Sequence, residues 1–70
     1  MTLMEALVNP NQDEFSALAR QGTASLLNAY TFPNFAFTPA QVRENFNSGL
    51  ESPEAARHQA SLFEQANLAV

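Results

Sequence analysis

Apolar side chains recur at steps of three and four residues along much of the chain, a spacing that puts them on one face of a helix. The spacing predicts a helix of about five turns that begins between Asn9 and Asp13. A glycine inside a helix lowers helix stability by roughly 1 kcal/mol relative to alanine. Gly22 is therefore either tolerated without a structural role or marks a point where another helix approaches closely. The stripe consists of Phe15, Leu18, Ala19, Gly22, Leu26, Ala29 and Tyr30.

A shorter apolar pattern precedes this helix. Thr2 and Glu5 have the spacing of a capping box, in which each side chain accepts a hydrogen bond from the other residue's backbone. The pair predicts a short first helix that carries Leu3, Met4, Leu7 and Val8 and ends at Asn9-Pro10, because the residue before proline avoids helical angles.

Pro33 prevents the long helix from continuing, and the segment Phe32–Phe37, here called the aromatic connector, holds three phenylalanines. Thr38-Pro39-Ala40-Gln41 then gives the strongest start signal in the chain, with a capping threonine, a proline at the first helical position and a glutamine at the third. Phe37 and Val42 flank this cap at the spacing of a hydrophobic staple. The third helix is expected to end at Gly49 in a left-handed conformation, with Leu50 folding back.

The last helix is predicted to begin at Ser52-Pro53-Glu54 by the same capping logic. Its apolar residues form two adjacent stripes that consist mostly of alanine, so we expect close contact with another helix. The pattern as a whole predicts an all-α fold, a small four-helix bundle-like module with an aromatic connector between its second and third helices, over residues 1–70 as a single domain. The stripes are Ala56, Ala60, Phe63 and Asn67, and beside them Ala55, Leu62, Ala66 and Ala69.

Charge and composition narrow the classes of function. Three Lys and Arg against seven Asp and Glu give a formal net charge of −4, which argues against binding to nucleic acid or to anionic membranes. No apolar run is long enough to span a bilayer, and no signal peptide stands at the start. Only 14% of the residues are charged, and without cysteine no disulfide can stabilise the fold.

A chain of 70 residues buries a small hydrophobic core, which gives only marginal stability. We therefore expect the chain to assemble with itself or with a protein partner.

Groups that could carry catalysis are sparse. His58 and Glu54 share a helix face, but no further ligand completes a metal site, and an exposed pair is the simpler interpretation. No serine lies in a nucleophile elbow, and two glycines cannot form a phosphate loop. We therefore predict no enzymatic activity, no catalytic residue, no metal and no cofactor.

The aromatic side chains are the remaining candidates for contact with a ligand or partner. Tyr30 at the end of the long helix is expected to pack in the core, with a role in contact as the alternative. Phe37 is assigned to the staple. Phe32 and Phe35 either complete the core or face something outside it. The predicted contact residues are therefore Phe32, Phe35 and Tyr30.

The chain resembles the C-terminal region of the plant protodermal factor family, which are proline-rich, secreted proteins of epidermal cell walls, and is similar to a domain of secreted bacterial proteins. The resemblance rests on "ARQGTASLLNAY" at 19–30, "FAFTPAQVRENF" at 35–46 and "AARHQASLFEQANLA" at 55–69. The family's region follows a cysteine- and tryptophan-rich motif and a proline-rich tract, and neither is present here. The resemblance implies an extracellular, structural setting and no reaction.

These observations lead to one expected function and two alternatives. The expected function is a non-enzymatic structural or interaction module, extracellular or associated with the cell wall, that packs against a partner or against copies of itself. The first alternative is a binding module for a small apolar ligand held against the aromatic connector. The second is a small intracellular subunit of a multiprotein complex, if Met1 is the natural start.

Overall fold

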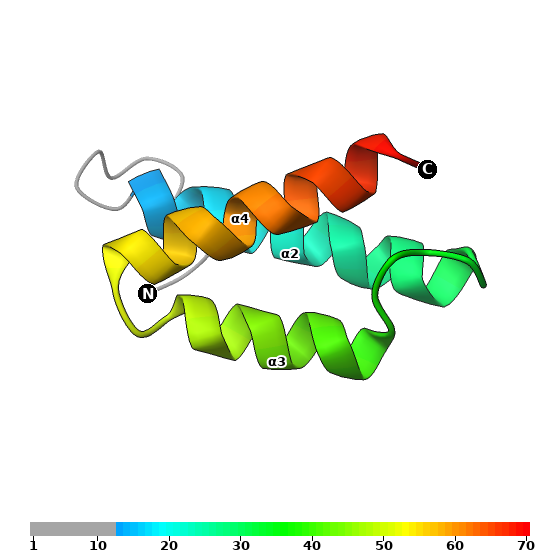
Figure 1. Cartoon of the computed structure of the whole chain (residues 1–70), viewed down its shortest axis with the longest axis horizontal. Coiled ribbons are helices and arrows are strands. Elements are labelled where there is room, and N and C mark those ends of the chain that lie inside the picture. Colours follow the sequence, from blue (N-terminus) through cyan, green and yellow to red (C-terminus); the bar gives the residue numbers. More distant parts are fainter. Residues whose placement is uncertain (1–12) are drawn as a thin grey trace.

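The computed structural model describes residues 13–70, which fold into three helices, α2 (Asp13–Thr31), α3 (Pro39–Gly49) and α4 (Pro53–Leu68). Figure 1 shows α2 and α4 running in the same direction and α3 running back between their ends. Each helix is in contact with both of the others. The predicted all-α class is confirmed for residues 13–70, which contain no strand. The predicted four helices are not matched there, since three are present and the expected first helix lies outside the described residues.

The starts of α3 and α4 follow from hydrogen bonds between residues three apart. The Gln41 N–H donates to Thr38 Oγ1 at 3.1 Å and the Thr38 N–H donates to Gln41 Oε1 at 2.9 Å, so the predicted capping box is confirmed. The Ala55 N–H donates to Ser52 Oγ at 3.0 Å, which confirms the cap of α4. Each such cap contributes about 1 kcal/mol.

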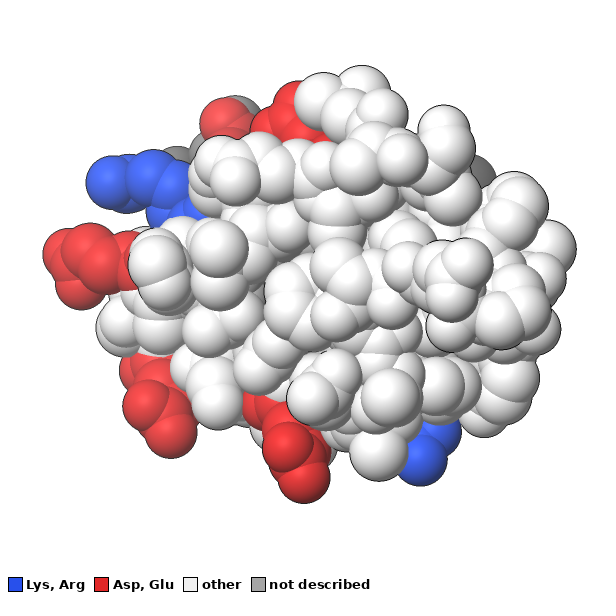
Figure 2. Space-filling model, turned by 45° about the vertical axis from the view of Figure 1, so that its right-hand side comes forward, with Lys and Arg blue, Asp and Glu red and all other residues white. Residues whose placement is uncertain are grey.

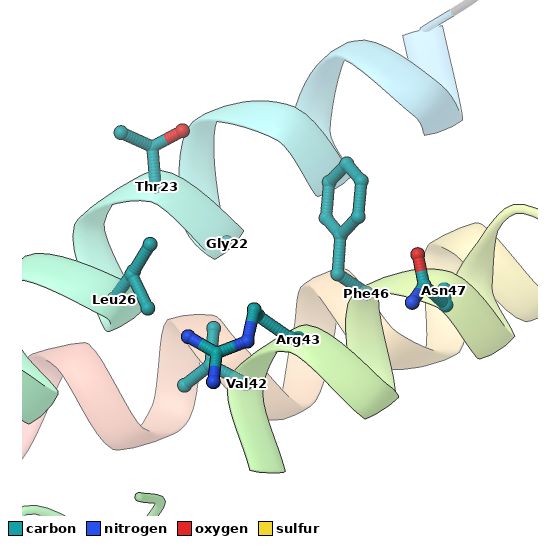
Figure 3. A pocket seen from close by; sticks show the side chains of 7 residues that line it. All are labelled: Gly22, Thr23, Leu26, Val42, Arg43, Phe46 and Asn47. Carbon is teal, nitrogen blue, oxygen red and sulfur yellow. The ribbon is translucent and has the colours of Figure 1, made fainter. Parts of the chain in front are cut away.

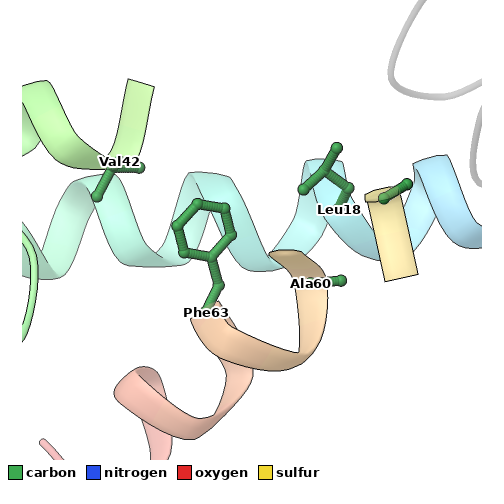
Figure 4. Close-up of a cluster of buried hydrophobic side chains, with 5 residues drawn as sticks. Leu18, Val42, Ala60 and Phe63 are labelled. Carbon is green, nitrogen blue, oxygen red and sulfur yellow. The ribbon is translucent and has the colours of Figure 1, made fainter. Parts of the chain in front are cut away.

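The core lies where the three helices face one another, and Figure 4 shows its members converging. Leu18 from α2 and Phe63 from α4 are fully buried, and complete burial of such a side chain contributes roughly 1.5–3 kcal/mol. The small alanine side chains of α4 let its backbone lie close to α2. The buried cluster is Leu18, Val42, Ala56, Ala60 and Phe63, and Phe15, Ala17, Leu26, Ala29, Phe37 and Phe46 pack against it.

Gly22 marks a close approach between helices. A Cβ atom at this position would lie 3.0 Å from Phe46 Cδ2 and 3.6 Å from Phe63 Cε2. The interpretation of Gly22 as a packing position is therefore confirmed, and the neutral alternative is not.

The prediction that Gly49 ends α3 in a left-handed conformation is wrong. Neither glycine has a positive φ, and Gly49 is the last residue of the helix itself. Leu50 is the cap, with φ −77° and ψ −8°, and its side chain is exposed. The physical reason for the glycine is packing, because a Cβ on Gly49 would lie 2.7 Å from Leu18 Cδ2.

The aromatic connector is tied to the core through a series of rings. The Phe35 N–H donates to the Phe32 carbonyl oxygen at 3.1 Å and closes a turn. The Phe35 and Phe37 ring centroids are 6.2 Å apart, and those of Phe37 and Phe63 are 5.8 Å apart, both edge to face. Phe37 also packs against the buried cluster, of which Val42 is a member. The connector is therefore anchored at its Phe37 end.

Candidate interaction surface

One end of the bundle carries no charged side chain. Between Gln21 and Val42, and again from Gln65 to Val70, the sequence contains no Asp, Glu, Lys or Arg. These stretches form the last turns of α2 and α4 and the aromatic connector, which lie together at one end of the molecule in Figure 1. Figure 2 shows a broad uncharged face with the charged side chains around its edge. We call this region the uncharged end.

Most of the large apolar side chains that the described residues expose lie at the uncharged end. Leu68 is 78% exposed and Tyr30 is 68% exposed, whereas Leu50, at the opposite end, is 51% exposed. Single exposed apolar residues are ordinary, but exposed apolar residues that gather at one end of a molecule are a candidate surface for contact with another molecule. The exposed group at this end is Leu27, Tyr30, Phe32, Leu68 and Val70.

The three predicted contact residues all lie at this end, but in different environments. Phe32 is exposed, and Phe35 is half-buried with its ring against Phe37. The expectation that Tyr30 packs in the core is wrong, because its side chain is mostly exposed. The last turn of α2, to which Tyr30 belongs, reaches past the start of α3 in Figure 1. Whether these residues meet a partner stays a prediction.

A groove opens between the aromatic connector and the end of α4. Its volume is about 300 Å³, and its lining is mostly apolar. Sequence reasoning named the connector phenylalanines but not the residues of α4, which are distant along the chain. The lining residues are Phe32, Asn34, Phe35, Ala36, Ala66, Ala69 and Val70.

A polar network centred on Asn67 supports the uncharged end from inside. Asn67 Oδ1 accepts hydrogen bonds from Ser25 Oγ and Asn28 Nδ2, both at 2.9 Å. Asn67 Nδ2 donates to the Gln21 carbonyl oxygen at 3.2 Å and to Gln21 Oε1 at 2.9 Å. The network fixes α4 against α2 over two turns.

Sequence reasoning placed Asn67 on a buried stripe but missed its partners. Ser25 is completely buried. It lies three residues after Gly22, and residues three apart share a helix face. The Ser25 hydroxyl on an otherwise apolar helix face indicates a hydrogen-bond partner on another helix, because a buried polar group requires one.

The charged part of the molecule contains one ion pair that joins two helices. Arg57 Nη2 lies 3.2 Å from Glu14 Oε1. A backbone hydrogen bond at the start of α2 is the main cause that lowers the pKa of Glu14, and the hydrogen bond from Arg57 adds to it. Both side chains are in contact with water, so the pair contributes little to stability.

The described residues offer little else for chemistry. No three His, Cys, Asp or Glu side chains among residues 13–70 are grouped as metal ligands. His58 is exposed on α4. No helix within residues 13–70 has the length and apolar character needed to cross a membrane.

Comparison with known proteins agrees with the resemblance in the sequence. The family described as the protodermal factor 1 C-terminal domain matches residues 1–69. Protodermal factor 1 of Arabidopsis thaliana is 48% identical over 67 residues, which cover 96% of this chain and 22% of that protein. The chain thus spans about a fifth of the length of this relative. No solved structure matches it. The chain therefore belongs to the family of the protodermal factor 1 C-terminal domain.

Proposed function

We propose that this domain is a non-enzymatic interaction module that associates through its uncharged end with the same end of a second copy. One observation carries the proposal, namely that the exposed apolar side chains gather where charged side chains are absent. An apolar surface gains roughly 25 cal/mol for each Å² removed from water. No buried charge opposes that gain at this end.

The distribution of charge favours contact between like ends. Two copies that each carry a net charge of −4 repel one another. The repulsion is weakest when the charged parts point away from each other, since screening acts over about 10 Å at 0.1 M salt. A symmetric contact also lets an exposed side chain of each copy enter the apolar groove of the other.

Family membership supports an extracellular setting for this module. The relative is more than four times as long as the matched region, which covers 22% of it, so the domain acts as one part of a larger protein there. Self-association of such a domain would join the longer chains that carry it. We propose this joining as its structural role in a secreted protein.

Two exposed leucines at opposite ends give a matched test. Leu68→Glu places a charge at the uncharged end, and Leu50→Glu places the same charge at the other end. We expect the sedimentation coefficient and the melting temperature of the unchanged protein and of Leu50→Glu to rise with concentration. Leu68→Glu should stay monomeric at every concentration. A monomer in the unchanged protein, or equal association by both variants, would overturn the proposal.

The groove beside the connector supports a second candidate, a binding module for a small uncharged apolar ligand. Its lining of Phe32, Phe35 and Ala66 offers an apolar surface without a charged group. Phe35→Ala separates the candidates when the helical content is intact. Loss of binding to cyclohexanol with association unchanged favours the ligand site, and loss of association favours the contact between copies.

A further inference from the structure

A second pocket lies between α2 and α3, and it shares no lining residue with the connector groove. Its volume is about 260 Å³. Figure 3 shows side chains from both helices around it, with Gly22 at the back on α2 and the Phe46 ring rising from α3. The lining residues are Gly22, Thr23, Leu26, Val42, Arg43, Phe46 and Asn47. We call this space the α2–α3 pocket.

The floor of the α2–α3 pocket is apolar and rests on the core. Val42 is 2% exposed and belongs to the core cluster, and Leu26 and Phe46 pack against that cluster. The Phe46 ring packs against Gly22, where a Cβ atom would lie 3.0 Å from Phe46 Cδ2, and both residues line the pocket. Ligand sites are usually roughly 300–1,000 Å³, so a space of this size suits a small molecule with one ring or a short chain.

Arg43 brings a positive charge to this apolar space. Figure 3 shows its side chain running along the gap between the two helices near Leu26 and Val42. Its neighbours at three and four positions along α3 are Pro39, Ala40, Phe46 and Asn47, so no carboxylate is at helical contact distance. Within residues 13–70 the ion pair is between Arg57 and Glu14, and Arg43 has no such partner.

The rim of the α2–α3 pocket carries two further polar side chains, Thr23 and Asn47. The Thr23 hydroxyl already donates to the Ala19 carbonyl oxygen at 2.7 Å. The Asn47 side chain lines the same pocket as Arg43 and carries an amide N–H₂. A guanidinium beside an apolar floor is an arrangement that suits a carboxylate with an apolar body.

We propose that the α2–α3 pocket binds a small organic carboxylate, with its apolar body against Leu26, Val42 and Phe46. The carboxylate accepts hydrogen bonds from the Arg43 guanidinium. The overall negative charge of the protein repels anions, so recognition depends on this local cation. The connector groove has no charged lining residue and does not meet the same requirement.

Two probes that differ only in charge test the proposal on the full chain. We expect 3-phenylpropanoate to shift the amide resonances of Gly22, Leu26 and Val42 in NMR titrations. 3-Phenylpropan-1-ol has the same body without the carboxylate and should bind about tenfold more weakly, since hydrogen bonds to charged groups are the stronger ones. Equal affinity for the two probes, or shifts confined to Phe32 and Phe35, would overturn the proposal.

Variants of two arginines complete the test. Arg43→Gln should reduce the affinity for 3-phenylpropanoate to that for the alcohol, whereas Arg20→Gln, on the opposite side of α2, should leave it unchanged. Both side chains are exposed, so both variants are expected to fold. Leu68→Glu should still bind the carboxylate, which separates this site from the contact between copies. An affinity that Arg43→Gln does not lower would contradict the assignment.

Discussion

Two glycines show at the residue scale how the absence of a side chain shapes this molecule. Neither has a positive φ, so neither is required for its conformational freedom. Gly49 makes room for Leu18, and Gly22 makes room for the Phe46 ring and leaves a pocket beside it. The two positions differ in how far their neighbours can move, because Leu18 is fully buried and Phe46 is half-buried.

Gly49→Ala is expected to lower the free energy of unfolding by about 1–3 kcal/mol, the usual cost of an overpacked core. The new Cβ would lie 2.7 Å from Leu18 Cδ2 and 3.3 Å from Gln59 Cβ, so the fully buried Leu18 side chain must shift within the core. Gly22→Ala should cost less, because the Phe46 ring borders a pocket and can shift. Urea unfolding of both variants measures the difference, and equal losses would contradict it.

The sequence could show that Gly49 was special, but not why. A glycine at the end of an apolar stripe, followed by leucine, is the usual pattern of a left-handed helix end. The same sequence pattern arises when a side chain from another helix occupies the space that a Cβ atom on the glycine would need. Leu18 lies on another helix, and only the packing of α2 against the end of α3 distinguishes the two causes.

At the scale of elements, local signals were sufficient for the helix starts. Thr38 and Ser52 cap their helices by accepting hydrogen bonds from residues three positions later. Both partners of each cap are therefore visible within one short stretch of sequence. The pairing of α2 with α4 depends on distant residues. Asn67 was predicted on a buried face, but its bonds to Ser25 and Asn28 depend on how the helices are aligned. The misplacement of Tyr30 has the same origin, since a stripe does not show where the neighbouring helix begins.

Asn67→Ala should lower the free energy of unfolding by about 1–3 kcal/mol, the cost of leaving buried polar groups without partners. The Ser25 hydroxyl, which is completely buried, would lose its acceptor. Gln65→Ala, an exposed position on the same helix, is the control and should change stability by less than about 0.5 kcal/mol. Thermal unfolding followed by circular dichroism measures the stability of both variants. An unchanged stability in Asn67→Ala would show that the network is not required.

At the scale of the whole molecule, charge and apolar surface are separated. The acidic side chains visible in Figure 2 lie around the edge of the uncharged face, and the Glu14–Arg57 pair joins the first halves of α2 and α4. The sequence shows where charged residues are absent, yet it does not show that two such stretches meet at one end. That meeting follows from the parallel arrangement of α2 and α4.

The pH dependence of stability is expected to report on Glu14. Its pKa is lowered in the folded state from the ordinary value of 4.5, so its contribution is fully present above that value and is lost as the pH falls through the folded pKa. The difference in unfolding free energy between the unchanged protein and Glu14→Gln should therefore be largest at neutral pH and shrink in acid. Arg57→Gln should remove only part of this pH-dependent difference, because the backbone hydrogen bond to Glu14 remains. Denaturant melts over this pH range would contradict the assignment if the difference stayed constant.

The parallel pairing of α2 and α4 also has a consequence for the order of folding. The hydrogen bonds of Asn67 join residues 39 to 46 positions apart, whereas α3 meets each neighbour through a short connection. Contacts that close long loops form later than local ones. The two antiparallel helix pairs should thus form first, and the Asn67 network should close after the transition state. Its loss would then accelerate unfolding and leave the folding rate nearly unchanged.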